Sequence, residues 1–314
     1  MSHPRVKLVF MGSPDFALPS LEALVGSQRY RPELVVTQPD RRRGRGKRVL
    51  PTPVKSRALE MGLPVAEMSR ASYADGVARV ASVSPDVIVV VAFGIILRDD
   101  LLRLPRLGCV NVHASLLPRH RGVSPIQAAI LAGDEETGCT TMLIDAGVDT
   151  GGILLQESTG VDPNETAGTL SDRLSSLGAG LLVKTLDRLN EGTITPSPQD
   201  DSQATYAGKI RKDSGAIDWN TGAVAVDRHI RAMSPWPSAF TFLDGRRLIV
   251  ERAVPATGGY GAGEPGAVVS TDPLVISCGE GHLEIRYLKP EGKKSMTPAA
   301  FLAGHELSVG SKLG

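Results

Sequence analysis

The fold is decided first by residues 6–24, which read VKLVFMGSPDFALPSLEAL. The apolar run Val6–Met11 is typical of a buried strand, and Gly12 ends it. After the turn, the apolar side chains of Leu18–Leu24 recur at helical spacing. A buried strand that turns directly into a helix is the building unit of α/β proteins, so this stretch predicts that fold class.

The alternation of strands and helices continues along the first half of the chain. A strand, a helix and two further strands are expected in this order, at residues 33–37, 54–61, 86–91 and 108–113. Strands separated by helices of this length predict a doubly wound, mostly parallel, Rossmann-like sheet. Ligands of such sheets bind outside the carboxyl ends of the strands, so the residues after Met11, Val91 and Val112 are expected on one functional edge.

The second half of the chain begins with two strands expected within residues 139–157 and a long helix at 165–189. Residues 191–208 show no periodicity and indicate a linker between domains 1–190 and 209–314. Beyond it, a helix is expected at 224–233 and short strands at 240–243, 248–253, 267–269, 274–277 and 283–288. Short strands separated by Gly and Pro turns predict a small OB-like β-barrel.

Composition and charge exclude several classes of protein. The 314 residues carry 35 Lys and Arg against 34 Asp and Glu, a formal net charge of +1, and 4% aromatic residues. This balance excludes a globally basic nucleic-acid-binding tail and a broad base-stacking platform. Any contact with nucleic acid must therefore come from a local patch of charge.

The cysteines and histidines argue against a disulfide framework and a metal site. Cys109, Cys139 and Cys278 form no C-x-x-C pair, and the six histidines show no metal-ligand spacing. The longest apolar run, residues 87–97, is about half the length that a membrane helix needs. The N-terminal apolar run is too short for a signal peptide. We expect a soluble, cytoplasmic protein with free thiols, no metal and no membrane contact.

The most informative stretch is residues 111–127, which read NVHASLLPRHRGVSPIQ. In a strand, Asn111 and His113 are two residues apart and project from the same face. They also lie at the carboxyl end of a predicted parallel strand, where a polar pair can stabilise an oxyanion and manage a proton. The alternative is that Asn111 caps a turn and His113 packs in the core.

A carboxylate near His113 would strengthen the catalytic interpretation. The Gly-rich turn at residues 145–152 carries both Asp145 and Asp149, and its glycines allow backbone to pass close to another loop. A carboxylate beside His113 would orient its ring and help it exchange a proton near neutral pH. Sequence spacing alone does not distinguish Asp145 from Asp149, and either could only close the turn.

A second candidate site is a cationic loop near the N-terminus. Six cations occur within eight residues, with no acidic residue among them: Arg41, Arg42, Arg43, Arg45, Lys47 and Arg48. In a protein of balanced charge, such a cluster indicates a local phosphate-binding segment. The alternative is a solvated surface loop, although such loops usually mix both signs of charge.

Short motifs are distributed over both predicted domains. They are Gly12–Phe16, Thr37–Arg41, Gly44–Lys47, Asn111–Arg119, Arg121–Gly122, Pro125–Gln127, Asp149–Gly151, Ile217–Trp219 and Ser234–Trp236. Through these motifs the chain resembles the folate-dependent formyltransferases nearly from end to end. The Asn–x–His…Asp set is common to that fold family, whereas residues 37–41 and the second-domain motifs narrow the resemblance to the methionyl-tRNA formyltransferase family.

The resemblance implies the substrates and the reaction. The donor would be 10-formyltetrahydrofolate, and the acceptor the α-amino group of methionine esterified to initiator tRNA. The amine would attack the formyl carbon directly, through a tetrahedral intermediate and without a metal. Domain 1–190 would bind the folate and carry out catalysis, and the OB-like domain 209–314 would bind tRNA. We expect a monomer by default.

The resemblance also implies roles for individual residues. Asn111 would polarise the formyl oxygen, and His113, oriented by Asp149, would handle protons. The folate contacts would fall on Ser115, Leu116, Leu117 and Pro118. The cationic loop would reach toward the acceptor stem of the tRNA, with Arg41 among its contacts.

Two other functions remain open at this point. A formyltransferase for a free small-molecule amine would share the Asn–His–Asp chemistry but would need neither the cationic loop nor the second domain. A non-catalytic tRNA-binding protein would need no such constellation and no folate site. A formyl-transfer assay with methionyl-tRNA and with free amines separates all three functions.

Overall fold

The computed structural model describes residues 5–27, 29–43 and 48–314. The chain forms two compact units, each described here by itself. Unit 1 comprises Met1–Pro125, Glu136–Gly160 and Ser171–Tyr206, and unit 2 comprises Ile126–Glu135, Val161–Leu170 and Ala207–Gly314.

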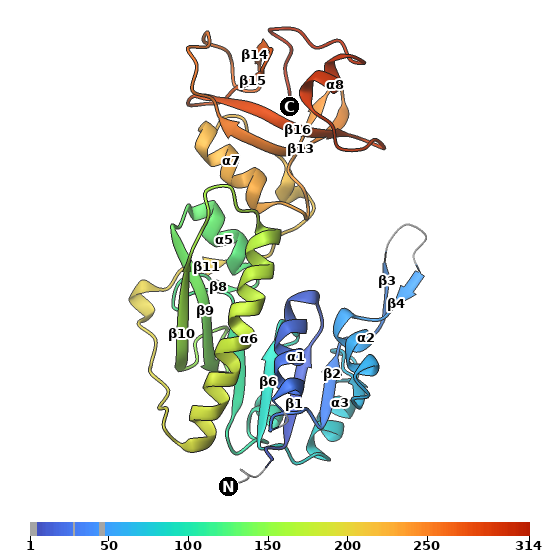
Figure 1. The fold of residues 1–314 in the computed structure, drawn as a ribbon, viewed down its shortest axis with the longest axis vertical. Helices are drawn as coiled ribbons and strands as arrows, with labels where there is room; N and C mark the ends of the chain where they lie inside the picture. Colours follow the sequence, from blue (N-terminus) through green and yellow to red (C-terminus); the bar gives the residue numbers. More distant parts are fainter. Residues whose placement is uncertain (1–4, 28, 44–47) are drawn as a thin grey trace. The chain divides into compact units, whose positions relative to one another are not determined.

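Unit 1 is built on a seven-stranded sheet with the order β10-β9-β7-β6-β1-β2-β5 (Figure 1). Five strands run parallel: β1 (Leu8–Gly12), β2 (Leu34–Thr37), β5 (Val65–Glu67), β6 (Val87–Val91) and β7 (Cys109–His113). Two strands complete the sheet in antiparallel pairing: β9 (Glu136–Leu143) and β10 (Ile153–Gly160). The doubly wound, mostly parallel sheet expected from the sequence is confirmed.

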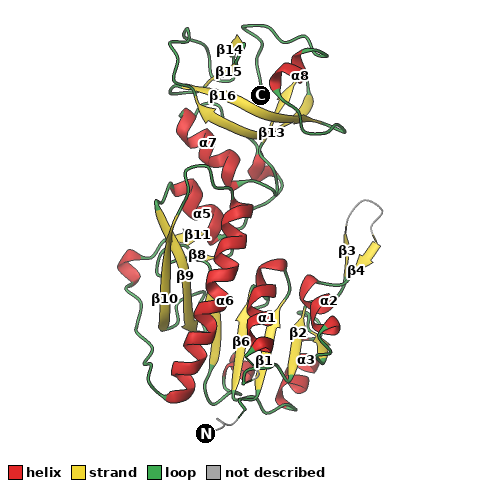
Figure 2. Ribbon diagram, viewed as in Figure 1, coloured by secondary structure: helices red, strands yellow, loops and turns green. Residues whose placement is uncertain are grey.

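Helices cover both faces of this sheet (Figure 2). They are α1 (Leu18–Gly26), α2 (Pro53–Glu60), α3 (Tyr73–Ala81), α4 (Asp99–Leu102) and α6 (Ala167–Glu191). Alternate residues of β1 enter different cores: Leu8 and Phe10 pack with α1, α2 and α6, whereas Val9 and Met11 pack with α3 and α4. Burial on both faces explains the continuous apolar strands, because parallel strands have no solvent side.

Unit 2 contains a five-stranded antiparallel half-barrel sheet with the order β12-β13-β16-β15-β14. Its strands are β12 (Phe240–Leu243), β13 (Arg246–Pro255), β14 (Val268–Thr271), β15 (Leu274–Ser277) and β16 (His282–Pro290). Helix α7 (Ala223–Ala232) packs on β13 and β16, with Val226 and Ile230 buried. Unit 2 also contains α8 (Pro298–Leu302) and most of α5 (Pro125–Ala132).

The segment expected as a linker, residues 191–208, lies largely against unit 1. Ser197 exchanges two backbone hydrogen bonds with Ile153 of β10, each 2.8 Å long. A short 3-10 helix follows at Asp201–Gln203, and β11 (Tyr206–Ala207) pairs with β8 (Arg121–Gly122). The regular elements of the segment are only two or three residues long, which is too short to produce a helical or strand period in the sequence.

Elements that were not predicted from the sequence include β5, α3, α4, α8 and the hairpin of β3 (Arg41–Arg43) and β4 (Arg48–Leu50). Strands β3, β4 and β5 are only three residues long, and α4 and α8 span four and five residues. Helix α3 does carry a helical apolar period, through Tyr73, Val77 and Val80. Within the described ranges, none of the helices has the length and apolar character needed to cross a membrane.

Candidate active site

Strand β7 presents the two polar side chains that the sequence singled out. Its residues alternate in direction, so Asn111 and His113 project from the same face near the carboxyl end of the strand. Asn111 is half-buried, and in the described part of the chain its carboxamide makes no hydrogen bond to another group. A carboxamide without a protein partner at a ligand-binding edge is available to donate to a substrate oxygen.

The imidazole of His113 is held from both sides. Its side chain is 6% exposed, and Nδ1 lies 3.6 Å from Oδ2 of Asp149. On the other side, Nε2 lies 2.9 Å from the carbonyl oxygen of His120. A carbonyl oxygen only accepts, so Nε2 is the donor in this contact, and Nδ1 is the ring nitrogen that faces the carboxylate of Asp149.

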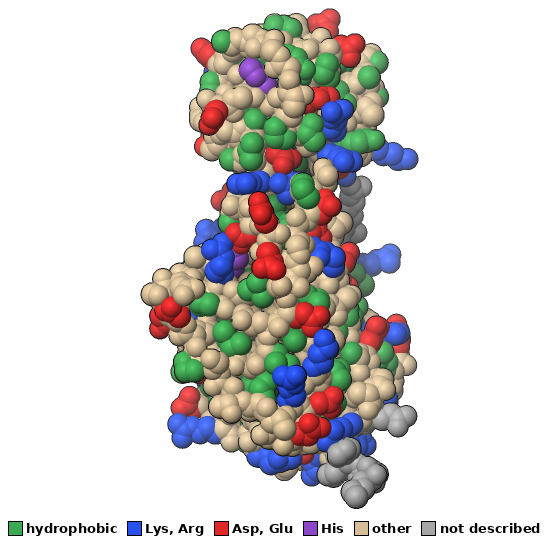
Figure 3. Space-filling model, turned by 60° about the vertical axis from the view of Figure 1, so that its left-hand side comes forward, with side chains coloured by type: hydrophobic (Ala, Val, Ile, Leu, Met, Phe, Trp, Pro, Cys, Tyr) green, Lys and Arg blue, Asp and Glu red, His purple; other side chains and the backbone are tan. Residues whose placement is uncertain are grey.

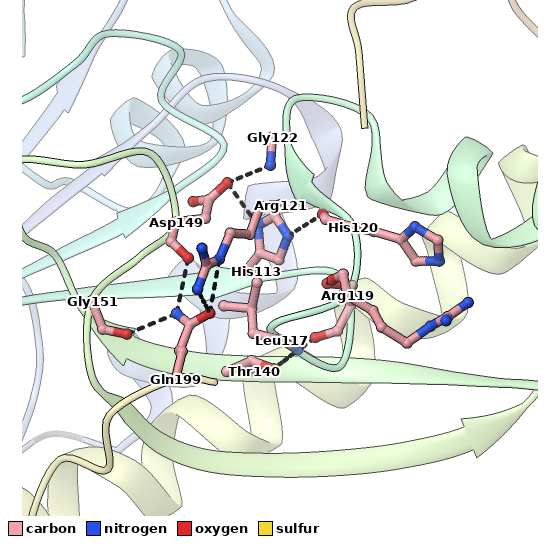
Figure 4. A network of polar contacts seen from close by, with 11 residues as sticks. His113, Leu117, Arg119, His120, Arg121, Gly122, Thr140, Asp149, Gly151 and Gln199 are labelled. Atoms are coloured by element: carbon pink, nitrogen blue, oxygen red, sulfur yellow. Dashed lines mark hydrogen bonds and ion pairs between the residues drawn. The ribbon is translucent and has the colours of Figure 1, made fainter. Parts of the chain in front are cut away.

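The carboxylate of Asp149 is placed by its own unusual backbone. Asp149 has a φ of +54°, the left-handed region that non-glycine residues rarely adopt. Its Oδ2 accepts a hydrogen bond of 2.7 Å from the amide of Gly122, in addition to facing His113 (Figure 4). A Cβ at the nearby Gly151 would lie 1.7 Å from the Leu143 carbonyl oxygen, so only glycine permits this approach of the turn.

The other carboxylate of the turn has a different role. Oδ1 of Asp145 accepts hydrogen bonds from the Gly147 amide at 3.0 Å and from Thr150 Oγ1 at 2.7 Å. Asp145 therefore closes the turn, and Asp149 is the carboxylate that the fold brings to His113. The structure thus separates two aspartates that sequence spacing left equivalent.

The loop that follows β7 is anchored to the neighbouring antiparallel strands. Thr140 of β9 donates to the Ser115 carbonyl at 2.7 Å, and its Oγ1 accepts from the Leu117 amide at 3.1 Å. Gln156 of β10 donates to the Leu117 carbonyl at 2.9 Å. No sequence pattern marks Thr140 or Gln156, because their roles depend on the pairing of β9 and β10 with segments far away in the chain.

The four residues expected to contact folate differ in exposure. Ser115 is fully buried, and its Oγ donates to the Arg119 carbonyl at 2.6 Å. Leu117 is also buried, whereas Leu116 and Pro118 are half-buried. Side-chain contact with a ligand at this loop is therefore open to Leu116 and Pro118, while Ser115 shapes the loop.

A buried arginine and a glutamine complete the polar network in Figure 4. Arg121 is 2% exposed and donates to Oε1 of Gln199, which in turn donates to the backbone of the Asp149 turn. Arg121 belongs to a motif that the sequence highlighted, but Gln199 was missed. Nothing in the pattern of the aperiodic segment 191–208 marks this residue.

The cationic loop is flanked by β3 and β4, which pair in antiparallel register. Arg41 and Arg48 are exposed, and Arg45 and Lys47 lie outside the described residues. At the base of this hairpin, Nζ of Lys55 lies 2.8 Å from Asp40 and 2.5 Å from Glu67, and these two hydrogen bonds raise the pKa of Lys55. On the face shown in Figure 3, by contrast, basic and acidic side chains are interspersed.

The cysteines are poor candidates for nucleophiles. All three are free thiols in buried positions. Burial raises the pKa of Cys109 and Cys139 to about 12 and that of Cys278 to about 11. A thiol of such high pKa is not ionised near neutral pH, so it supplies no thiolate. Among the residues that the structure describes, no group of three or more His, Cys, Asp or Glu is arranged to hold a metal ion.

Both halves of the chain match known protein families, and the fold matches solved structures. Residues 6–186 match the family described as formyl transferase, and residues 209–306 match the formyl transferase C-terminal domain. An N-formyltransferase from Helicobacter canadensis in complex with folinic acid and dTDP-3-aminofucose has a TM-score of 0.65 at 20% identity, over 89% of this chain and 98% of that one. HypX from Aquifex aeolicus in complex with tetrahydrofolic acid has a TM-score of 0.65 at 13% identity, over 98% of this chain and 51% of that one. At these identities the likeness concerns the fold.

Sequence relatives narrow the family. The methionyl-tRNA formyltransferase of Citrifermentans bemidjiense is 45% identical over 311 residues, covering 98% of this chain and 96% of the relative. That of Pelobacter propionicus is 47% identical over 309 residues, again covering 98% of this chain and 96% of the relative. With both domains matched and the identity sustained nearly end to end, the chain belongs to the methionyl-tRNA formyltransferase family.

Proposed function

We propose that the protein transfers the formyl group of 10-formyltetrahydrofolate to the α-amino group of methionyl-initiator tRNA, giving N-formylmethionyl-tRNA for translation initiation. The observation that carries this proposal is identity of about 45% to methionyl-tRNA formyltransferases across 98% of the chain, including both domains. The contact between His113 and Asp149 beside Asn111 supplies polar groups that suit the chemistry. Action in the cytoplasm follows from the substrate, which is a translation initiator.

Asn111 is the residue that we assign to the developing oxyanion. As the amine attacks the formyl carbon, negative charge grows on the formyl oxygen, and a tetrahedral intermediate forms. An amide N–H donor stabilises that charge without exchanging a proton. The Asn111 carboxamide has no hydrogen bond to other described residues, so it can donate without breaking an existing bond.

His113 and Asp149 are the residues that we assign to the protons. The hydrogen bond from Nε2 to the His120 carbonyl fixes the ring, which leaves Nδ1 to accept the proton of the attacking amine. Asp149 Oδ2 then stabilises the imidazolium, which returns the proton to N10 of the folate as the C–N10 bond breaks and tetrahydrofolate leaves. The separation of 3.6 Å is longer than a hydrogen bond, and catalytic contacts in the absence of substrate are often long.

The folate is assigned to the loop that contains Ser115, Leu116, Leu117 and Pro118. Its hydrogen bonds to Thr140 and Gln156 hold the loop in one shape before a ligand arrives. A loop ordered in advance loses less entropy on binding. We keep the monomer as the proposed oligomeric state, to be checked by the molar mass of the purified protein in solution.

The test is a formyl-transfer assay with separate acceptors. Purified protein and 10-formyltetrahydrofolate are incubated with methionyl-initiator tRNA, free methionine or an amino sugar, and the formylated product is measured. We expect product with methionyl-tRNA alone. Transfer to a free amine at a comparable rate would support the small-molecule formyltransferase instead, and tRNA binding without transfer would support the non-catalytic protein.

The cationic loop, with its flanking strands β3 and β4, is proposed to contact tRNA phosphates. Charge reversal in β3 tests this contact. Replacing Arg41, Arg42 and Arg43 together by Glu should raise KM for methionyl-tRNA by at least about tenfold near 100 mM salt. The slope of log kcat/KM against log salt should become shallower by about two to three, because each lost phosphate contact removes about 0.7–0.9. Steady-state kinetics over a salt series measure both values.

A matched control separates local contacts from net charge. Arg70, Arg79 and Arg103 are exposed, belong to unit 1 and lie outside the hairpin. Their replacement by Glu makes the same change in total charge and should leave the salt slope nearly unaltered. Equal effects from the two triple variants would mean that the hairpin has no special contact with tRNA.

A further inference from the structure

The side chain of Gln199 occupies an unusual place for a residue of an aperiodic segment. It lies between the guanidinium of Arg121 and the turn that carries Asp149 (Figure 4). Oε1 accepts from Nε of Arg121 at 3.0 Å and from Nη2 at 2.8 Å. Nε2 donates to the carbonyl oxygens of Asp149 at 2.9 Å and of Gly151 at 2.8 Å.

These contacts use the full hydrogen-bonding capacity of the carboxamide. The oxygen of glutamine accepts two hydrogen bonds, and its nitrogen donates two. A rotation of the amide by 180° would place N–H groups against the guanidinium and an oxygen against two carbonyls. The orientation of Gln199 is therefore determined by its partners, and its side chain acts as a rigid connection rather than as a surface group.

The arginine that Gln199 binds, Arg121, is itself held in place by several hydrogen bonds. Besides Gln199, Nη2 donates to Oδ1 of Asp201 at 2.7 Å, and the backbone amide of Arg121 donates to the Thr205 carbonyl at 2.8 Å. The guanidinium is 2% exposed, so solvent does not compete for its donors. Residues of the segment after α6, among them Gln199, Asp201 and Thr205, thus hold Arg121 in place.

The other end of the connection is the backbone of Asp149. A left-handed φ of +54° at a non-glycine residue persists only where the surroundings hold it. Gln199 binds the carbonyl of Asp149 itself and that of Gly151, on the two sides of Thr150. The carboxylate of Asp149 then accepts from the amide of Gly122, the residue that follows Arg121. The contacts form a closed ring from Arg121 through Gln199 and Asp149 back to Gly122.

We propose that Gln199 is a positioning residue, which holds the turn at Asp149 so that its carboxylate faces His113. The proposal rests on the catalytic role of Asp149 in the proposed function. Gln199 touches neither His113 nor the carboxylate, so it acts through the backbone of the turn. Gln199 thus links one residue of the aperiodic segment after α6 to the candidate active site.

The central variant is Gln199→Met, which keeps the length of the side chain and removes its hydrogen bonds. A displacement of the carboxylate by about 1 Å is expected to lower kcat by about 10- to 100-fold, with KM for both substrates within about twofold. The matched control is Gln203→Met, the same substitution four residues away. Gln203 is exposed, and among the described residues its side chain donates to Asp200 alone, so this variant should keep the wild-type kcat.

Two further kinetic variants separate positioning from general stability. Gln199→Glu keeps an acceptor for Arg121 but cannot donate to the carbonyls of the turn, so it should be as impaired as Gln199→Met. In an Asp149→Ala background, Gln199→Met should reduce kcat by less than about twofold, because the group it positions is already absent. The proposal would be overturned if Gln199→Met reduced kcat by the same factor in the Asp149→Ala background as in wild type. Wild-type activity of Gln199→Glu would overturn it as well.

A readout that does not depend on catalysis completes the test. The Gly122 amide is bonded to the Asp149 carboxylate, so its hydrogen exchange reports whether that carboxylate is in place. We expect exchange about tenfold faster in Gln199→Met than in wild type and unchanged in Gln203→Met. Unchanged exchange in Gln199→Met would refute the positioning role. Loss of the proposed function would instead appear as absent formyl transfer by the wild type, with the exchange result unaffected.

Discussion

Replacing His113 by Asn is expected to lower kcat for formyl transfer by about 100- to 10,000-fold while the Kd for methionyl-tRNA changes by less than about threefold. The imidazole is buried, and its Nδ1 is the only ring nitrogen not committed to a backbone carbonyl. Asparagine preserves a polar side chain but neither takes up a proton near neutral pH nor reaches both partners. Single-turnover kinetics and filter binding measure the two quantities separately.

A second histidine serves as the control for this substitution. His305 stacks on Phe301 and interacts through Nδ1 with the Phe301 carbonyl, within unit 2. His305→Asn should leave kcat within about twofold of wild type. If His113→Asn also kept near-normal turnover, the assignment of proton transfer to His113 would be wrong.

Replacing Asn111 by Ala is expected to lower kcat by about 100- to 1,000-fold, the usual effect of removing one oxyanion donor. The reason is differential binding, because the hydrogen bond strengthens as charge develops on the formyl oxygen. KM should change little, and the free energy of unfolding should change by less than about 1 kcal/mol, since the Asn111 carboxamide bonds to none of the described residues. Steady-state kinetics and urea denaturation provide the measurements.

Two comparison variants make this result specific. Asn164→Ala removes an exposed asparagine of unit 2 and should be indistinguishable from wild type. Asn111→Asp places an acceptor where a donor is needed, so it should be at least as impaired as Asn111→Ala. Substantial activity of Asn111→Asp would argue that Asn111 serves only to shape the strand end.

The parallel strands were predictable because their pattern is local. All five residues of Val87–Val91 are buried, and a strand covered on both faces is recognisable as a continuous apolar run. Helix α3 was not predicted, although Tyr73, Val77 and Val80 recur at helical spacing. It contains Gly76, a weak helix former, whose position is explained by packing: a Cβ there would lie 2.3 Å from Cε of Met68. Tertiary contact outweighs helix propensity at this site.

In the candidate site, too, some features follow from the local sequence and others from tertiary contacts. The sequence alone determined that Asn111 and His113 share one face of a strand end, because side-chain alternation is a property of any extended backbone. Only the tertiary structure decided that Asp149 rather than Asp145 faces the imidazole, and that Gln199 binds the turn beneath it. These contacts join segments far apart in the chain, and they depend on strand order and on a left-handed residue in a turn, which no local period encodes.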